Sequence, residues 1–221
     1  MSRSHPISPQ RGGSEPTAPG PPPNTWHTHR IALLRYVTHP EVTVDPATPV
    51  ERWALSPTGL ARARAMLEQP WVGELERIVS SDETKAVQTA ELLAEATGLR
   101  VEVRAGIGEN DRRATGFLPP EEFEATADRF FAQPERSIRG WERAVDAQSR
   151  IVDGLADLLD PAETRSTVVV GHGGVGTLWY CRLTDQPISR RHDQPGQGHH
   201  FTLDVTTGRV LHAWQPIDQR R

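Results

Sequence analysis

The pattern of hydrophobic and polar positions predicts strands that alternate with helices. Short apolar runs rich in β-branched residues, typical of strands, cover residues 30–37, 77–80, 99–104 and 167–170. Helices are expected over 56–69, 82–97, 121–132, 139–159 and 175–183, with the clearest three-, four- and seven-residue spacing of apolar positions in 139–159. Two short strands at 200–205 and 209–214 flank a Thr-Thr-Gly turn and predict a hairpin. This order predicts an α/β fold, a three-layer α/β/α sandwich with a mainly parallel central sheet.

Local signals predict where some of these elements begin and end. Ser56 followed by Pro57 is typical of a helix start, and Gly98 is typical of a helix end. Ser81 is expected to cap the helix over 82–97. The uninterrupted valine run at 168–170 indicates a strand that is buried on both faces.

Proline content divides the chain into two parts. Of its 19 prolines, seven fall in the first 23 residues, where large apolar side chains are scarce. Such a composition cannot offset the entropy of ordering, so residues 1–28 are expected to form a disordered tail. Residues 29–221 are long enough for one α/β domain with a sizeable core.

Composition excludes several classes of protein. The one cysteine, Cys181, excludes a disulfide framework and a multi-cysteine zinc site. Apolar runs are too short to span a membrane, and no secretory signal is recognisable, so a cytoplasmic protein is expected. The net charge of -4, without a Lys/Arg stripe, argues against a nucleic-acid partner.

Polar side chains follow three of the predicted strands. These are Thr38 and His39 after the first strand, Ser80, Ser81 and Lys85 after the second, and His172 among glycines after the valine-rich strand. Because the carboxyl ends of parallel strands meet at one edge of a sheet, these side chains are expected to converge. Two imidazoles, a cation and a helix N-terminus suit a phosphate group.

These residues resemble the motifs of the histidine phosphatase superfamily, in its phosphoglycerate mutase-like branch. The family pattern is a first strand ending in Arg-His-Gly, then Ser-Ser with an arginine and Gln-Thr-Ala on a helix, then a lone Glu, and finally Gly-His-Gly-Gly. This chain has Thr38-His39-Pro40, then Ser80-Ser81 with Lys85 and Gln88-Thr89-Ala90, then Glu109, and finally Gly171-His172-Gly173-Gly174. Order and spacing agree over residues 31–214.

The resemblance implies a metal-independent phosphatase that hydrolyses a phosphomonoester through a phosphohistidine, with no cofactor. It implies that His39 is the nucleophile, that His172 binds the equatorial phosphoryl oxygens, and that Glu109 protonates the leaving oxygen. Glycine at 173 allows the backbone to approach the phosphate. The implied partner is a small phosphorylated substrate. A homodimer, paired through an edge of the terminal hairpin, is an alternative that the sequence does not decide.

Two departures from the family pattern bear on the phosphate site. Thr38 stands in place of the first arginine, and Lys85 in place of the second, which keeps the charge but loses the bidentate fork. Arg35 is expected to point to the opposite face of its strand. Loop arginines that could contact the substrate are Arg112, Arg113, Arg190 and Arg191, of which Arg112 and Arg191 are taken as candidate phosphate- or substrate-binding residues.

Several alternatives remain open on the sequence. The domain could be a non-catalytic binding or regulatory module on a degenerate phosphatase scaffold, or its pocket could act on a different substrate. Glu41 and Asp111 are rival acids to Glu109. The run 171–176 also satisfies G-x-G-x-x-G, although no strand with an acidic end follows it as a dinucleotide site requires. The histidine pairs at 27/29 and 199/200 could bind a metal.

Overall fold

Six strands form one mixed sheet in the order β3-β2-β4-β1-β5-β6 within the residues that the computed structural model describes, which are 32–160, 162–163 and 165–219 together with Met1. The strands are β1 (Leu33–Thr38), β2 (Arg77–Ser81), β3 (Val101–Arg104), β4 (Thr167–Gly171), β5 (His199–Asp204) and β6 (Arg209–Pro216). Neighbours from β3 to β1 run parallel, whereas β5 and β6 are antiparallel. The predicted tail, residues 1–28, lies outside the described residues apart from Met1.

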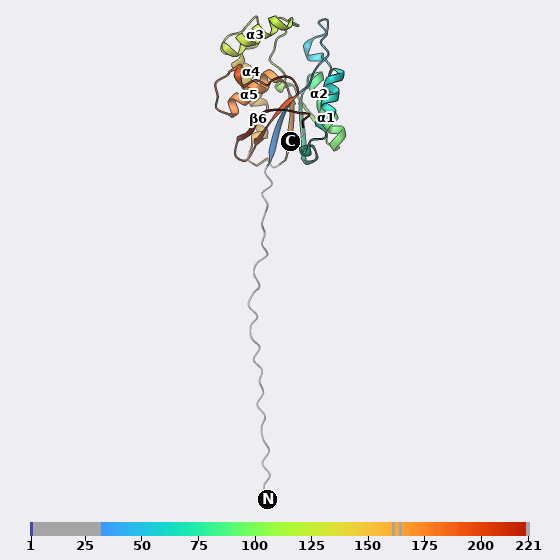
Figure 1. Cartoon of the computed structure of the whole chain (residues 1–221). Coiled ribbons are helices and arrows are strands. Elements are labelled where there is room, and N and C mark those ends of the chain that lie inside the picture. Colours follow the sequence, from blue (N-terminus) through green and yellow to red (C-terminus); the bar gives the residue numbers. More distant parts are fainter. Residues whose placement is uncertain (2–31, 161, 164, 220–221) are drawn as a thin grey trace.

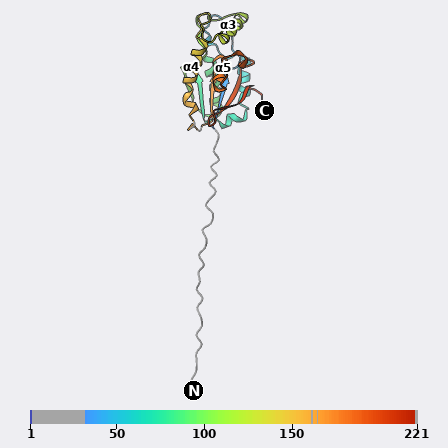
Figure 2. The same ribbon diagram turned by 90° about the vertical axis from the view of Figure 1, so that its left-hand side faces the viewer.

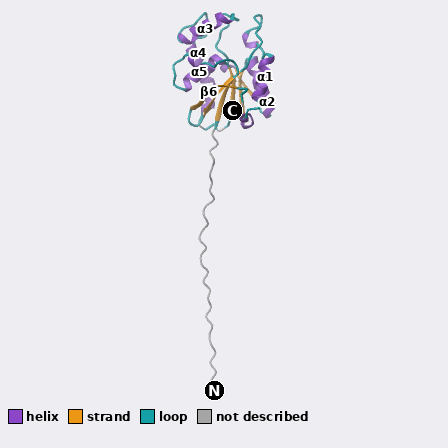
Figure 3. Ribbon diagram, in the orientation of Figure 1, coloured by secondary structure: helices purple, strands orange, loops and turns teal. Residues whose placement is uncertain are grey.

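Helices cover both faces of this sheet. One face carries α1 (Pro57–Met66) and α2 (Thr84–Thr97), and the other carries α4 (Ala144–Gly154) and α5 (Gly173–Leu183) (Figure 1). Helix α3 (Pro120–Ala132) lies beyond the end of the sheet rather than on a face (Figures 1 and 2). With helices on either side of the strands (Figure 3), the predicted three-layer α/β/α architecture is confirmed.

Two hydrophobic clusters fill the space between the layers. Val169 of β4 belongs to the cluster under α4 and α5, while Val168 and Val170 belong to the cluster under α1 and α2. All five residues of β4 are buried. The valine run therefore serves both cores, as its continuous apolar character predicts.

Helices α4 and α2 differ from the prediction at their boundaries, and α1 ends at Met66 where residue 69 was expected. The helix expected over 139–159 is α4, which begins only at Ala144 because Arg139 and Gly140 adopt positive φ angles of 53° and 81°. It gives way at Leu155 to a 3-10 turn over Ala156–Leu159. Ser81 is not the cap of α2, because this helix begins at Thr84 after Glu83, and Ser81 instead ends β2. The cap at Ser56, which accepts a hydrogen bond from the Gly59 N–H at 3.0 Å, is as predicted.

A cluster of aromatic rings joins β1, β5 and α5. Tyr36 is fully buried, stacked on Phe201 at 5.5 Å between ring centroids and tilted against Trp179 at the same distance. A Cβ atom at Gly176 would lie 2.4 Å from Cε1 of Tyr36, so α5 approaches the ring only because this residue is glycine.

Nothing among the described residues forms a helix long and apolar enough to cross a membrane.

We predict that Gly176→Ala lowers the free energy of unfolding by about 1–3 kcal/mol, because the added methyl group overpacks the aromatic cluster. The measurement is urea denaturation monitored by tryptophan fluorescence. Gly73→Ala is the matched control, since a Cβ there meets no atom within 4 Å. Equal stability of the two variants would contradict the packing argument.

Candidate active site

The carboxyl ends of β1 and β4 bring two histidines together. His39 follows β1, and its backbone N–H donates to the carbonyl of Gly171, the last residue of β4, at 3.1 Å. His172 follows directly. The two imidazole rings lie edge to face with 5.3 Å between their centroids. The predicted convergence of these strand ends is thus present in the structure.

Hydrogen bonding indicates which nitrogen of His39 carries the proton. The ring is buried, and Nδ1 lies 2.8 Å from the carbonyl oxygen of Pro40. A carbonyl oxygen only accepts, so we assign the proton to Nδ1, which donates it to Pro40. Nε2 then keeps its lone pair, as a nitrogen nucleophile requires.

His172 is held from two sides. Its Nε2 lies 2.6 Å from the hydroxyl of Ser81 and 3.5 Å from a carboxylate oxygen of Glu83. The Tyr36 hydroxyl accepts from the backbone N–H of His172 and donates to its carbonyl, both at 3.0 Å. Burial raises the pKa of Tyr36 above its ordinary value, so the hydroxyl stays protonated and can donate. Sequence reasoning missed Tyr36, whose place in an apolar run indicates only packing.

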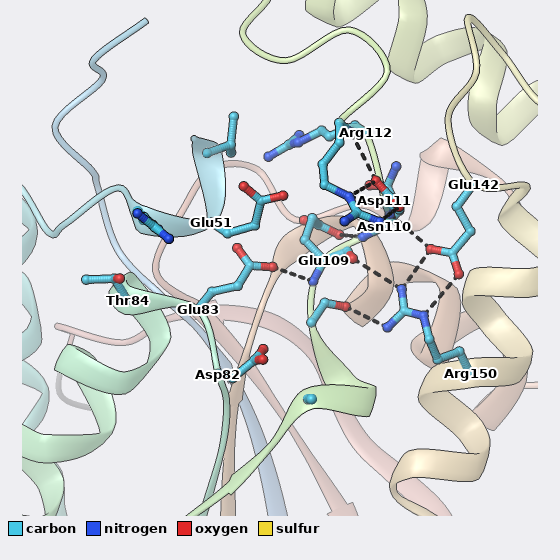
Figure 4. Close-up of a pocket in the computed structure, with 15 residues that line it drawn as sticks. Glu51, Asp82, Glu83, Thr84, Glu109, Asn110, Asp111, Arg112, Glu142 and Arg150 are labelled. Carbon is cyan, nitrogen blue, oxygen red and sulfur yellow. Dashed lines mark hydrogen bonds and ion pairs between the residues drawn. The ribbon is translucent and has the colours of Figure 1, made fainter. Parts of the chain in front are cut away.

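Lys85 is buried with a carboxylate partner. Its ammonium group forms an ion pair with Glu83 and donates to the carbonyl of Val50 at 2.9 Å. Glu83 also accepts the backbone N–H of Glu109 at 2.8 Å (Figure 4). The positive charge predicted for this site is therefore compensated locally. Glu83, which lies next to the predicted cap residue Ser81, was not foreseen as part of the site.

Glu109 lies at the N-terminus of α5. Its carboxylate accepts hydrogen bonds from the backbone N–H groups of Gly174 at 3.1 Å and Val175 at 3.0 Å. Burial alone would raise the pKa of Glu109, but His172, Arg112 and the surrounding N–H groups lower it below its ordinary value. The group is ionised at neutral pH and occupies a position where a helix N-terminus favours an anion.

Arg150 positions the loop that carries Glu109. Its guanidinium donates to the carbonyl oxygens of Gly108 at 3.0 Å and Glu109 at 3.1 Å, and it pairs with Glu142 at 2.8 Å (Figure 4). The rival acids are engaged elsewhere. Glu41 pairs with Arg62 and Asp111 with Arg113, which leaves Glu109 as the predicted acid beside His172.

Thr38 is tied to a glutamine that the sequence did not single out. Its hydroxyl donates to Oε1 of Gln194 at 2.6 Å and accepts the backbone N–H of His199 at 3.0 Å. The Gln194 amide is thereby directed at the start of α5, where a Cβ on Gly173 would lie 2.4 Å from its Nε2. No local signal marks Gln194, because it lies in a loop without periodicity.

A cavity of about 350 Å³ opens beside His39. Of the candidate residues from the sequence, those lining it are His39, Lys85, Glu109, Arg112, Gly173 and Arg190. Arg112 packs over the ring of Phe123 at 5.1 Å and forms no ion pair with a described residue. Arg190 pairs with Asp128, and Arg191 lies in a separate hollow with Tyr180.

A larger hollow of about 750 Å³ adjoins the first and shares Val50, Glu109, Asn110 and Arg112 with it (Figure 4). Its charged lining residues are Glu51, Arg52, Asp82, Glu83, Glu109, Asp111, Arg112, Arg113, Glu142 and Arg150. Nδ2 of Asn110 is buried without a hydrogen-bond partner in the described part of the chain.

The described residues contain no group of three His, Cys, Asp or Glu side chains placed to hold a metal ion. The histidine pair at 27/29 lies outside them.

We predict that acid destabilises the fold through these histidines. Burial first, together with the neighbouring positive charges, lowers the pKa of His39 and of His172 to about 3, against 6.5 for an ordinary imidazole. The unfolded chain binds protons that the folded chain does not, so the free energy of unfolding falls as pH falls from about 6.5 toward 3. Urea denaturation between about pH 7 and 5 measures this slope. His39→Asn should reduce it, and an unchanged slope in that variant would contradict the assignment.

Comparison with known proteins identifies a family and a shared fold. The family model of the histidine phosphatase superfamily (branch 1) matches residues 48–211. A mycobacterial glucosyl-3-phosphoglycerate phosphatase with inorganic phosphate is 23% identical, with 85% of this chain and 99% of that chain covered and a TM-score of 0.70. A phosphoserine phosphatase from Entamoeba histolytica, in complex with 3-phosphoglyceric acid, is 17% identical, with 86% of this chain and 100% of that chain covered and a TM-score of 0.69. Curated protein sequences give no match.

The solved structures and the family model support different conclusions, the first about fold and the second about family. At such low identity the solved structures establish a shared fold. The family match spans most of the chain but begins after His39, which the backbone hydrogen bond to Gly171 places beside the matched residues. On the strength of that match, this chain belongs to the histidine phosphatase superfamily, branch 1.

Proposed function

We propose that this chain hydrolyses a phosphomonoester of a small molecule through a phosphohistidine on His39. The observation that carries the proposal is the hydrogen bond from Nδ1 of His39 to Pro40, which leaves a neutral, buried imidazole with a free Nε2 lone pair beside His172. The related structures are named as phosphatases of glucosyl-3-phosphoglycerate and phosphoserine, both phosphate esters of small molecules, which supports the same class of substrate here.

The proposed reaction has two steps. Nε2 of His39 attacks phosphorus, the bond from phosphorus to the ester oxygen breaks, and Glu109 gives that oxygen a proton. Water then attacks the phosphohistidine, gives its proton to Glu109, and releases inorganic phosphate. Glu109 is ionised in the ligand-free site, so it must first bind a proton. A phosphate arriving at the N-terminus of α5 would displace the carboxylate from the N–H groups of Gly174 and Val175 and raise its pKa.

Arg112 is the proposed contact for a second polar or anionic group on the substrate. It lines both hollows at the site and has no ion-pair partner among the residues described. A guanidinium in this position suits a carboxylate or a hydroxyl-rich group next to the phosphoester.

A binding or regulatory module is the second candidate. The specific observation in its favour is that Lys85 is compensated by Glu83, while the carboxylate of Glu109 occupies the start of α5. Such a site offers an incoming phosphate less net positive charge than two free arginines would.

We predict that His39→Ala lowers phosphatase turnover by on the order of 10³-fold or more on a panel of phosphomonoesters. Acid-labile phosphate should be trapped on the wild type and be absent from the variant. The matched control is His192→Ala, which lies outside the His39 cavity. Equal turnover in wild type and His39→Ala would rule out the proposed mechanism, and binding without turnover in both would favour the module.

We predict that Thr38 and Gln194 act as one unit. Gln194→Ala removes an amide donor next to Gly173, and Thr38→Val removes the hydroxyl that directs this amide. Each single change should lower kcat/KM by about 10-fold, and the double variant by no more than either alone. If the losses in kcat/KM of the two single variants add in the double variant, Thr38 and Gln194 act independently.

Thr38→Arg tests whether the site lacks the arginine of the family pattern. Higher phosphatase turnover in this variant would mean that it does.

A further inference from the structure

A separate cavity of about 270 Å³ lies on the face of the sheet that carries α1 and α2. Arg35 of β1 is in register with Thr202 of β5, which pairs with His212 of β6, so these three side chains form a row on one face. Trp71, from the 3-10 turn Pro70–Glu74, covers the row. None of the lining residues is shared with the two hollows at the candidate active site.

Arg35 is buried here without full compensation. Its side chain is 9% exposed and lies over the Trp71 ring, 5.2 Å from the centroid. The nearest carboxylate is that of Glu74, 3.8 Å from Nη2 and beyond hydrogen-bond distance, on a side chain that is 57% exposed. Burial lowers the pKa of Arg35, and Glu74 offsets this only in part. A buried guanidinium whose charge is only partly compensated is energetically unfavourable unless an anion besides Glu74 binds to it.

Unsatisfied nitrogens are concentrated around this cavity. Of the seven buried side-chain N and O atoms that lack a hydrogen-bond partner in the described part of the chain, three belong to its lining residues. They are Nη1 of Arg35, Nε1 of Trp71 and Nδ1 of His200. The first two are obligate donors, and buried donors are almost always satisfied in folded proteins. A water molecule would satisfy the donors but would leave the positive charge of Arg35 uncompensated. An oxyanion would satisfy the donors and also compensate the charge.

We propose that this cavity binds a small oxyanion, a carboxylate or phosphate group, through Arg35 and Trp71. Glu74 lies on the Nη2 side of the guanidinium, and Nη1, which is buried without a partner among the described residues, is the donor left for the ligand. The cavity is large enough for inorganic phosphate or a short carboxylate. Gln215 and His212, both partly exposed, also line the cavity and can contact the rest of a longer ligand. This site is independent of the proposed phosphatase reaction.

The indole N–H of Trp71 provides a direct test. The full chain, labelled with ¹⁵N, gives one indole resonance for each of its six tryptophans, and Trp71→Phe identifies the one that belongs to Trp71. Inorganic phosphate and acetate are titrated separately, with chloride at matched ionic strength as the reference. We expect a saturable shift of the Trp71 resonance with at least one oxyanion. A shift with phosphate alone defines a phosphate site, and a shift with both defines a general oxyanion site.

Variants then assign the shift to this cavity. Arg35→Met should weaken the apparent affinity by at least about 10-fold, because it removes the charge and keeps the length of the side chain. Arg136→Met, a change at an exposed arginine outside the cavity, should leave the titration unchanged. His39→Ala should also leave it unchanged, which separates this site from phosphate bound at the candidate active site.

Two results would overturn the proposal. One is the absence of a saturable Trp71 shift in the wild type with either oxyanion, which would mean that the cavity holds water only. The other is a shift that persists with full affinity in Arg35→Met. If that variant does not fold, Arg35→Lys replaces it, and the wild-type titration decides the question without any variant.

Discussion

A single hydroxyl group positions the backbone on which the candidate active site depends. Tyr36 bonds both the N–H and the C=O of His172, from the centre of an aromatic cluster that is itself buried. Tyr36 can approach this backbone closely only because residues 171 and 176 are glycines. A Cβ at Gly171 would lie 2.3 Å from the Tyr36 hydroxyl, and one at Gly176 would meet the Tyr36 ring. The first and last glycines of the G-x-G-x-x-G run, Gly171 and Gly176, therefore serve packing against Tyr36, whereas Gly173 lies against Gln194. This packing gives a structural reason for glycine at both ends of the run.

The positions of His39 and His172 at the edge of the sheet are linked to the burial of Tyr36. β1 supplies Tyr36 on one face and ends at Thr38, so the chain that buries the ring also delivers His39 to the carboxyl edge. β4 lies next to it in parallel register and delivers His172 to the same edge. The distance between the two imidazoles is thus set by strand pairing, which is rigid, rather than by loop conformation.

The sequence predicted the parts of the site that depend on strand order, and missed those that depend on distant contacts. Alternation of apolar runs and helices was enough to place His39 and His172 at one edge, because parallel strands have only one carboxyl edge. Gln194 could not be found in this way, because its partner Thr38 is 156 residues away in the chain. The late start of α4 was missed because periodicity does not reveal the positive φ angles at residues 139 and 140.

Charge compensation determines what the site can accept. In the proposed reaction, a phosphoryl group at α5 would exchange places with the carboxylate of Glu109, so the hydrogen bonds of Gly174 and Val175 would change partner and not be lost. The pair formed by Lys85 and Glu83 gives no such exchange, because Glu83 also holds the backbone of Glu109 and stays in place. On this proposal, binding at the phosphoryl group alone would be weaker than in a site with two free arginines, because each charged hydrogen bond is worth about 1.5–3 kcal/mol. The remaining affinity has to come from contacts to the rest of the substrate. We infer that this chain selects its substrate by groups beyond the phosphate, for which Arg112 is the available cation.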